Sequence, residues 1–161
     1  MLKNIISRAF MAFCLILSAQ HVLADLSPME EKKLKRGIEE TIIESAGEIT
    51  AKHPDLALEF DWQAYDNLDW ATLGKKRADE MPYLKGHISS FGNGFNAACK
   101  DEDYKEELVK VTRIILTPAT EEGPSKKAQG KLDGTTLTIT FDSLGGTLGA
   151  DDWKKGIESA Y

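Results

Sequence analysis

The order in which helical and strand-like patterns follow one another restricts the fold of this sequence more than any other feature. Much of the stretch 28–99 carries apolar side chains at steps of three and four, the period of an amphipathic helix. Residues 111–141 instead contain β-branched runs and apolar–polar alternation, which are typical of strands. Because the two patterns do not alternate, the sequence predicts an α+β domain. We expect N-terminal helices packed on one face of a small antiparallel sheet of three or four strands, with a short C-terminal helix.

The first predicted helix covers residues 28–51. Ser27 can cap it, Pro28 suits the first helical position, and Glu30 completes a capping box. Pro54 prevents its continuation and disfavours helical geometry in the preceding residue. The apolar stripe of this helix is formed by Leu34, Ile38, Ile42, Ala46 and Ile49.

Further helices are predicted over residues 82–99, over residues 103–110 and near the C-terminus. Gly92 and Gly94 weaken the long one by about 1 kcal/mol each relative to alanine, so a break there is compatible with the pattern. Asp103 starts a capping box for the second, and Asp151 or Asp152 can cap the third.

The strongest strand signal is a hairpin around the pair Asp133–Gly134. Such a pair favours a type I′ turn, and it lies between the predicted strands 129–132 and 135–141. Another predicted strand covers residues 111–117 and ends at Pro118, and residues 119–127 form a polar loop.

Residues 1–24 have the layout of a secretory signal peptide. Basic residues precede an apolar run that is too short to span a membrane, and Val22 and Ala24 supply the small side chains that signal peptidase accepts. We therefore expect cleavage between Ala24 and Asp25. The mature chain, residues 25–161, is then a single periplasmic or secreted domain without a membrane anchor.

The charge and cysteine content limit the classes of partner. The chain has 26 acidic and 20 basic residues, for a net charge of −6, and two of the basic residues lie in the leader. Such an acidic domain repels phosphate backbones, so we do not expect nucleic acid as a partner. Only Cys99 remains after removal of the leader, which excludes an internal disulfide.

A search for catalytic or metal-binding patterns yields only weak candidates. On one continuous helix, Cys99 and His87 would lie about 18 Å apart along the axis, so a buried structural thiol is favoured. His53 is better explained as a helix-terminal residue. The acidic run 101–107 lacks the glycine and one oxygen ligand of a calcium loop, and the glycines of 144–149 match neither nucleotide fingerprint. We therefore predict no catalytic residue, no metal site and no cofactor.

The segment 60–70 is the predicted partner-binding site, because it interleaves aromatic and acidic side chains. Aromatic rings anchor protein interfaces with few rotatable bonds, and nearby carboxylates orient a partner. The alternative is that the tryptophans pack into the core and the aspartates cap helices. The residues concerned are Asp61, Trp62, Tyr65, Asp66, Asp69 and Trp70.

These observations favour binding over catalysis. The prediction is an exported soluble protein-binding domain, for example an inhibitor or immunity-type protein of the cell envelope. Its acidity would steer it toward a basic site on another protein. Two alternatives remain open: a small carboxylate-dependent envelope hydrolase and a carrier of a small apolar ligand. A hydrolase requires a carboxyl group with a raised pKa in a cleft, and a carrier requires an internal cavity.

Overall fold

The computed structural model describes residues 26–52, 54–119 and 127–161. The predicted signal peptide with its cleavage point, and most of the predicted loop 119–127, lie outside the described residues. Within the described ranges, no helix combines the length and the apolar character needed to cross a membrane.

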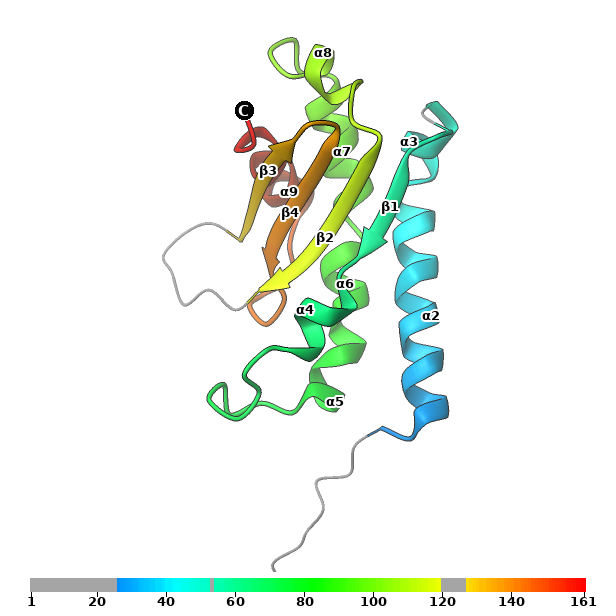
Figure 1. Ribbon diagram of the computed structural model, residues 1–161, viewed down its shortest axis with the longest axis vertical. Helices are drawn as coiled ribbons and strands as arrows, with labels where there is room; N and C mark the ends of the chain where they lie inside the picture. Colours follow the sequence, from blue (N-terminus) through cyan, green and yellow to red (C-terminus); the bar gives the residue numbers. More distant parts are fainter. Residues whose placement is uncertain (1–25, 53, 120–126) are drawn as a thin grey trace, which may run out of the picture.

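The domain consists of helices on one face of a four-stranded sheet. Figure 1 shows α7 and α9 behind the sheet and α2 alongside β1. The elements in chain order are α2 (Pro28–Ser45), α3 (Gly47–Lys52), β1 (Ala57–Phe60), α4 (Trp62–Asp66), α5 (Arg77–Glu80), the 3-10 helix η1 (Met81–Tyr83), α6 (Leu84–Ile88), α7 (Phe91–Cys99), α8 (Lys105–Leu108), β2 (Arg113–Ala119), β3 (Ala128–Asp133), β4 (Thr136–Asp142) and α9 (Ala150–Glu158).

The predicted α+β class, the four strands and the C-terminal helix are confirmed, but the sheet is mixed. Its order is β1-β2-β4-β3, with β1 parallel to β2, β2 parallel to β4, and only β3 antiparallel to β4. A long helical connection between β1 and β2 returns the chain to the same end of the sheet, which makes that pair parallel. The alternating apolar residues of β4 then take a central position, and the more polar β3 remains at the edge.

Two predicted helices are interrupted. The stretch 28–51 divides at Ala46 into α2 and α3. The stretch 82–99 breaks at Ser89 and Ser90, before Gly92 and Gly94, where the pattern was compatible with a break. The Ser90 hydroxyl donates to the carbonyl oxygen of Leu148 at 2.6 Å, so the break joins this segment to the loop after β4.

The strand boundaries also differ from the predicted ones. The hairpin turn is formed by Gly134 and Thr135, one residue later than expected, and Gly134 takes the left-handed φ of +58° that suits glycine. Strand β2 continues through Pro118 to Ala119. The missing N–H of Pro118 costs no ladder bond, because β1 ends opposite Leu116 and leaves that side of β2 without a neighbour.

The start of α8 also differs from the predicted one, because this helix begins at Lys105. The capping box expected from Asp103 does not form, since Tyr104 precedes the helix and no side chain caps it.

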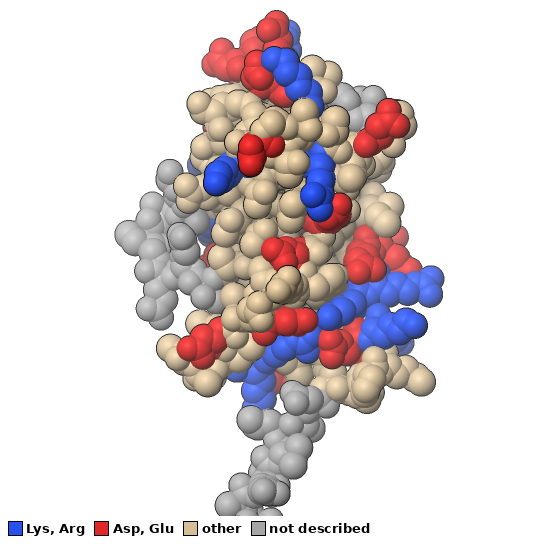
Figure 2. Space-filling model, viewed as in Figure 1, with Lys and Arg blue, Asp and Glu red and all other residues tan. Residues whose placement is uncertain are grey.

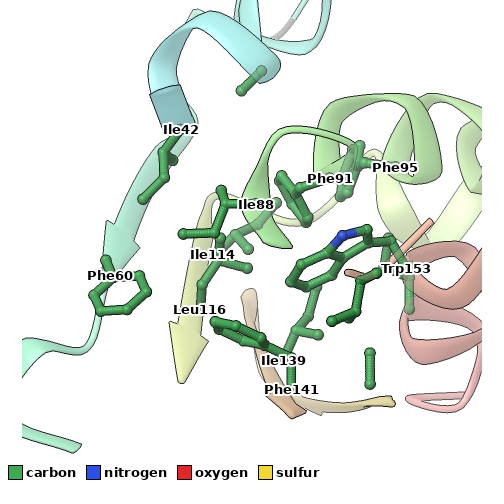
Figure 3. Packing of buried hydrophobic residues seen from close by; sticks show 14 of the residues in the cluster. Ile42, Phe60, Ile88, Phe91, Phe95, Ile114, Leu116, Ile139, Phe141 and Trp153 are labelled. Carbon is green, nitrogen blue, oxygen red and sulfur yellow. The ribbon is translucent and has the colours of Figure 1, made fainter. Parts of the chain in front are cut away.

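The hydrophobic core lies between the sheet and the helices (Figure 3). The Trp153 ring is fully buried. It makes an edge contact with Phe91 and a tilted contact with Phe141, with ring centroids 5.3 and 5.2 Å away. Of the stripe predicted for the first helix, Ile38, Ile42, Ala46 and Ile49 are buried, and Leu34 is partly buried.

His87 is a buried polar residue at the edge of this core, with an exposed fraction of 4%. Its carbonyl oxygen accepts a hydrogen bond from Nε1 of Trp153 at 3.1 Å, which joins α6 to α9. Burial lowers the pKa of the imidazole below its usual 6.5, while Asp142 and Glu80 oppose this effect and Lys75 adds to it. The folded protein therefore keeps His87 neutral to lower pH than the unfolded chain does.

We expect the free energy of unfolding to decrease as the pH falls below 6.5, because the unfolded chain then binds a proton at His87 that the folded protein does not bind. The His87 contribution is at most about 1.4 kcal/mol per pH unit, the limit for one proton. Urea unfolding between pH 7.5 and 5.5 should show a shallower pH dependence for His87→Phe than for the wild type. Identical slopes in the two proteins would contradict the assignment.

Candidate functional site

The predicted partner-binding residues lie together, in α4 and the turns on either side of it. Tyr65 is fully buried, and its hydroxyl donates to the carbonyl oxygen of Arg77 at 3.2 Å. Trp62 and Trp70 are partly buried and pack against the core. Nε1 of Trp62 donates to a Glu39 carboxylate oxygen at 3.1 Å, which connects α4 to α2. The aromatic members of the segment thus contribute to packing.

Each aspartate of the segment has a partner within the chain. Asp61 accepts the backbone N–H of Ala64 at 2.9 Å and caps α4. Asp69 accepts the backbone N–H of Thr72 at 3.1 Å and its hydroxyl at 2.7 Å, and these bonds, the backbone one first, lower the pKa of Asp69.

Asp66 binds Arg77 at 2.6 Å, and Arg77 also binds Glu31 of α2 at 2.7 Å. These contacts agree with the alternative interpretation, in which the tryptophans of the segment pack against the core and its aspartates cap helices. Its use as a contact surface stays a prediction.

Replacing Trp62 with alanine should lower the free energy of unfolding by about 1 to 3 kcal/mol, less than for a fully buried tryptophan. The ring of Trp62 contacts Phe60 with centroids 4.4 Å apart, and Nζ of Lys35 lies 5.0 Å from its centroid. Gln63→Ala, at an exposed position of the same helix, serves as the control. Equal stability of the two variants in urea unfolding would show that Trp62 contributes little to packing.

The other extended surface of interest is the sheet face that the helices leave uncovered. Alternate residues of β2 and β4 point away from the core and are partly exposed. Thr140 pairs with Thr117 on one side and with Gln129 on the other, and Thr138 pairs with Ile115. We name the uncharged residues of this surface the open face; they are Ile115, Thr117, Gln129, Thr136, Thr138 and Thr140. Thr136 lies at its margin, between Arg113 and Asp133.

The open face has no charged side chain at its centre, and charges lie at its margins. Figure 2 shows mostly uncharged surface over β2 and β4. Arg113 and Glu59, on neighbouring strands, form a two-pronged ion pair with distances of 3.0 and 2.6 Å. The bonds from Arg113 lower the pKa of the Glu59 carboxyl. Lys131 and Asp133 occupy exposed positions of the edge strand β3.

Sequence reasoning identified the alternation of threonines in β4 but did not identify the open face. The threonines at 136, 138 and 140 face solvent as their period-2 pattern indicates. Their neighbours Ile115 and Thr117 belong to an apolar strand that the sequence could not orient. Only the parallel register between β2 and β4 places the two sets side by side.

The described residues contain no cluster of three or more histidine, cysteine or acidic side chains arranged to hold a metal ion. In the same part of the chain, every carboxyl group with a shifted pKa has it lowered by hydrogen bonds or ion pairs. These groups are ionised acceptors in caps and ion pairs, whereas a general acid needs a raised pKa.

No protein-family model, no curated protein and no solved structure matches this chain.

Proposed function

We propose that this protein is an exported binding module, of the inhibitor or immunity type, which docks a basic protein partner on the open face of its sheet. In this proposal, the leader directs export and is cleaved between Ala24 and Asp25. The observation that carries the proposal is the array of six uncharged, partly exposed or exposed side chains on neighbouring strands, with charges at the margins.

The distribution of charge supports an interface. The centres of protein interfaces are depleted in charged residues, and their rims are polar. On α2, by contrast, the exposed positions carry mostly lysine, arginine and glutamate, for example Lys32, Arg36 and Glu40. Centre and rim of the open face therefore follow the arrangement expected of an interface.

The threonine and isoleucine side chains of the open face would lose little conformational entropy when a partner binds. Threonine and isoleucine are branched at Cβ and have restricted χ1 angles, and the strands that hold them are paired. Few rotamers have to be ordered when a partner docks on such a surface. The hydroxyl groups of Thr117, Thr138 and Thr140 offer donors and acceptors to a partner's polar groups.

The partner is expected to be basic, because the chain has a net charge of −6. Such a charge accelerates encounter with a positively charged protein, and the association rate then decreases with salt.

The experiment that tests the proposal places a photo-crosslinking side chain at Thr138 and, as a control, at Lys33 on the exposed side of α2. The protein is crosslinked in cells that export it, and the adduct is identified and purified for binding measurements. We expect a basic protein to crosslink from Thr138 and not from Lys33. Thr138→Arg should weaken its binding about 100-fold or more, since an arginine would have to be desolvated at the centre of the interface.

Gln63→Arg adds the same charge at an exposed position outside the open face and should leave the affinity unchanged. Adducts that form equally from both positions, or full binding by Thr138→Arg, would overturn the proposal.

A further inference from the structure

A polar cleft lies apart from the open face, between α6 and the loop that follows β4. It has a volume of about 640 Å³, within the range of small-molecule sites. One wall comes from Tyr83 and His87, and the other from the loop residues Gly145, Gly146 and Thr147. These two walls are distant in the sequence and are joined only by the tertiary structure.

Lys75 is part of the lining of the cleft. Nζ of Lys75 donates to the carbonyl oxygen of Leu144 at 3.0 Å and lies 3.4 Å from a carboxylate oxygen of Glu80. The lysine therefore connects the two walls, and its charge is balanced by the glutamate. With a neutral His87, the lining has no net charge.

His87 supplies a hydrogen-bonding ring to the lining of the cleft. The side chain is 96% buried, yet its Nδ1 has no hydrogen-bond partner among the described residues. Buried polar groups are nearly always paired, and a buried N–H is the group least often left without a partner. The proton of the neutral ring is thus assigned to Nε2, and because His87 lines the cleft, this N–H is available to a ligand oxygen there.

We propose that this cleft binds a neutral saccharide unit. A sugar offers hydroxyl groups that both donate and accept, which match the Nε2–H of His87, the Thr147 hydroxyl and the Glu80 carboxylate, three groups of residues that line the cleft. It also has an apolar C–H face for an aromatic ring, and the ring of Tyr83 is 65% exposed at the edge of the cleft.

The glycine wall and the charge balance agree with this ligand class. A Cβ at Gly146 would meet no atom within 4 Å, so the cleft borders bare main chain there, and its carbonyl and N–H groups can reach a ligand. A phosphate or another multiply charged anion would require an unbalanced positive charge, whereas the cleft's lysine is already paired with Glu80.

The test is a titration of the ¹⁵N-labelled protein with four neutral sugars and one anion, followed by NMR. The sugars are glucose, N-acetylglucosamine, cellobiose and chitobiose, and the anion is inorganic phosphate. We expect at least one sugar to cause saturable shifts confined to Gly145, Gly146, Thr147 and the residues around His87, while phosphate causes none there. Absence of such shifts with all four sugars, or shifts with phosphate alone, would overturn the proposal.

Variants then locate the contacts. Tyr83→Ala should weaken sugar binding about 10-fold, the effect of losing one aromatic contact. Tyr161→Ala, another partly exposed tyrosine far from the cleft lining, should not change it. Thr147→Val tests the hydroxyl contact without removing a buried side chain, because Thr147 is exposed. Unchanged affinity in both Tyr83→Ala and Thr147→Val would exclude this cleft as the sugar site.

Discussion

Replacing Trp153 with alanine should lower the free energy of unfolding by about 3 to 5 kcal/mol, a large part of the stability of an average domain. Trp153 is fully buried between α7 and the sheet, and its ring contacts Phe91 and Phe141 (Figure 3). The variant leaves a cavity lined by these rings and also removes the hydrogen bond from Nε1 to the carbonyl oxygen of His87. That carbonyl is then left buried without this donor.

Equilibrium unfolding in urea measures this effect, and Trp153→Phe separates its two components. Phenylalanine keeps most of the ring volume but cannot donate the hydrogen bond, so its cost should be smaller, about 1 to 3 kcal/mol. If Trp153→Ala lost less than about 1 kcal/mol, α9 would not be part of the cooperative core.

Gly92→Ala is expected to destabilise the protein by about 3 kcal/mol or more, although alanine is the better helix former. Gly92 lies in α7, where it faces the end of α2. A Cβ at this position would lie 1.5 Å from the carbonyl oxygen of Ser45 and 2.4 Å from its carbonyl carbon. Both are backbone atoms, so the clash cannot be relieved by a rotamer change and the two helices must move apart.

Gly86→Ala is the matched control, because Gly86 lies inside the neighbouring helix α6 and a Cβ there would meet no atom within 4 Å. This variant should be neutral or more stable by up to about 1 kcal/mol. Opposite signs for the two substitutions in thermal or urea unfolding would confirm the close helix contact. Equal effects would show that α2 and α7 do not approach one another as described.

Local sequence patterns were sufficient to predict those segments whose structure is determined by their own residues. Ser27, Pro28 and Glu30 start α2 as predicted: the Ser27 hydroxyl accepts the Glu30 N–H at 3.4 Å, and the Glu30 carboxylate accepts the Ser27 N–H at 3.0 Å. The β3–β4 hairpin was also predicted from local patterns: Gly134 indicates the turn, and the period-2 alternation indicates which apolar residues of β4 face the core. The register of the turn was missed by one residue, because Gly134 can take its left-handed conformation at either central position.

Contacts between distant segments decided the candidate sites. The open face depends on β2 pairing with β4 in parallel, and the cleft depends on Lys75 reaching the loop after β4. Neither contact produces a periodic pattern in the sequence, because other helices and strands lie between the residues that meet. The aromatic segment around Trp62 had the opposite property: its composition was conspicuous, but its aspartates and the Trp62 indole have polar partners inside the chain.

The sequence by itself therefore determined the class of the fold, the hairpin and the buried stripe of the first helix, because hydrophobic period, caps and turn residues act within a few positions of the chain. The tertiary structure decided the parallel strand pairs, the break at Ser90 and the need for glycine at position 92. It also decided which polar groups remain exposed on the open face and which line the cleft. These features depend on which surfaces meet when the core closes, and packing between distant segments is not encoded by the local propensity of either one.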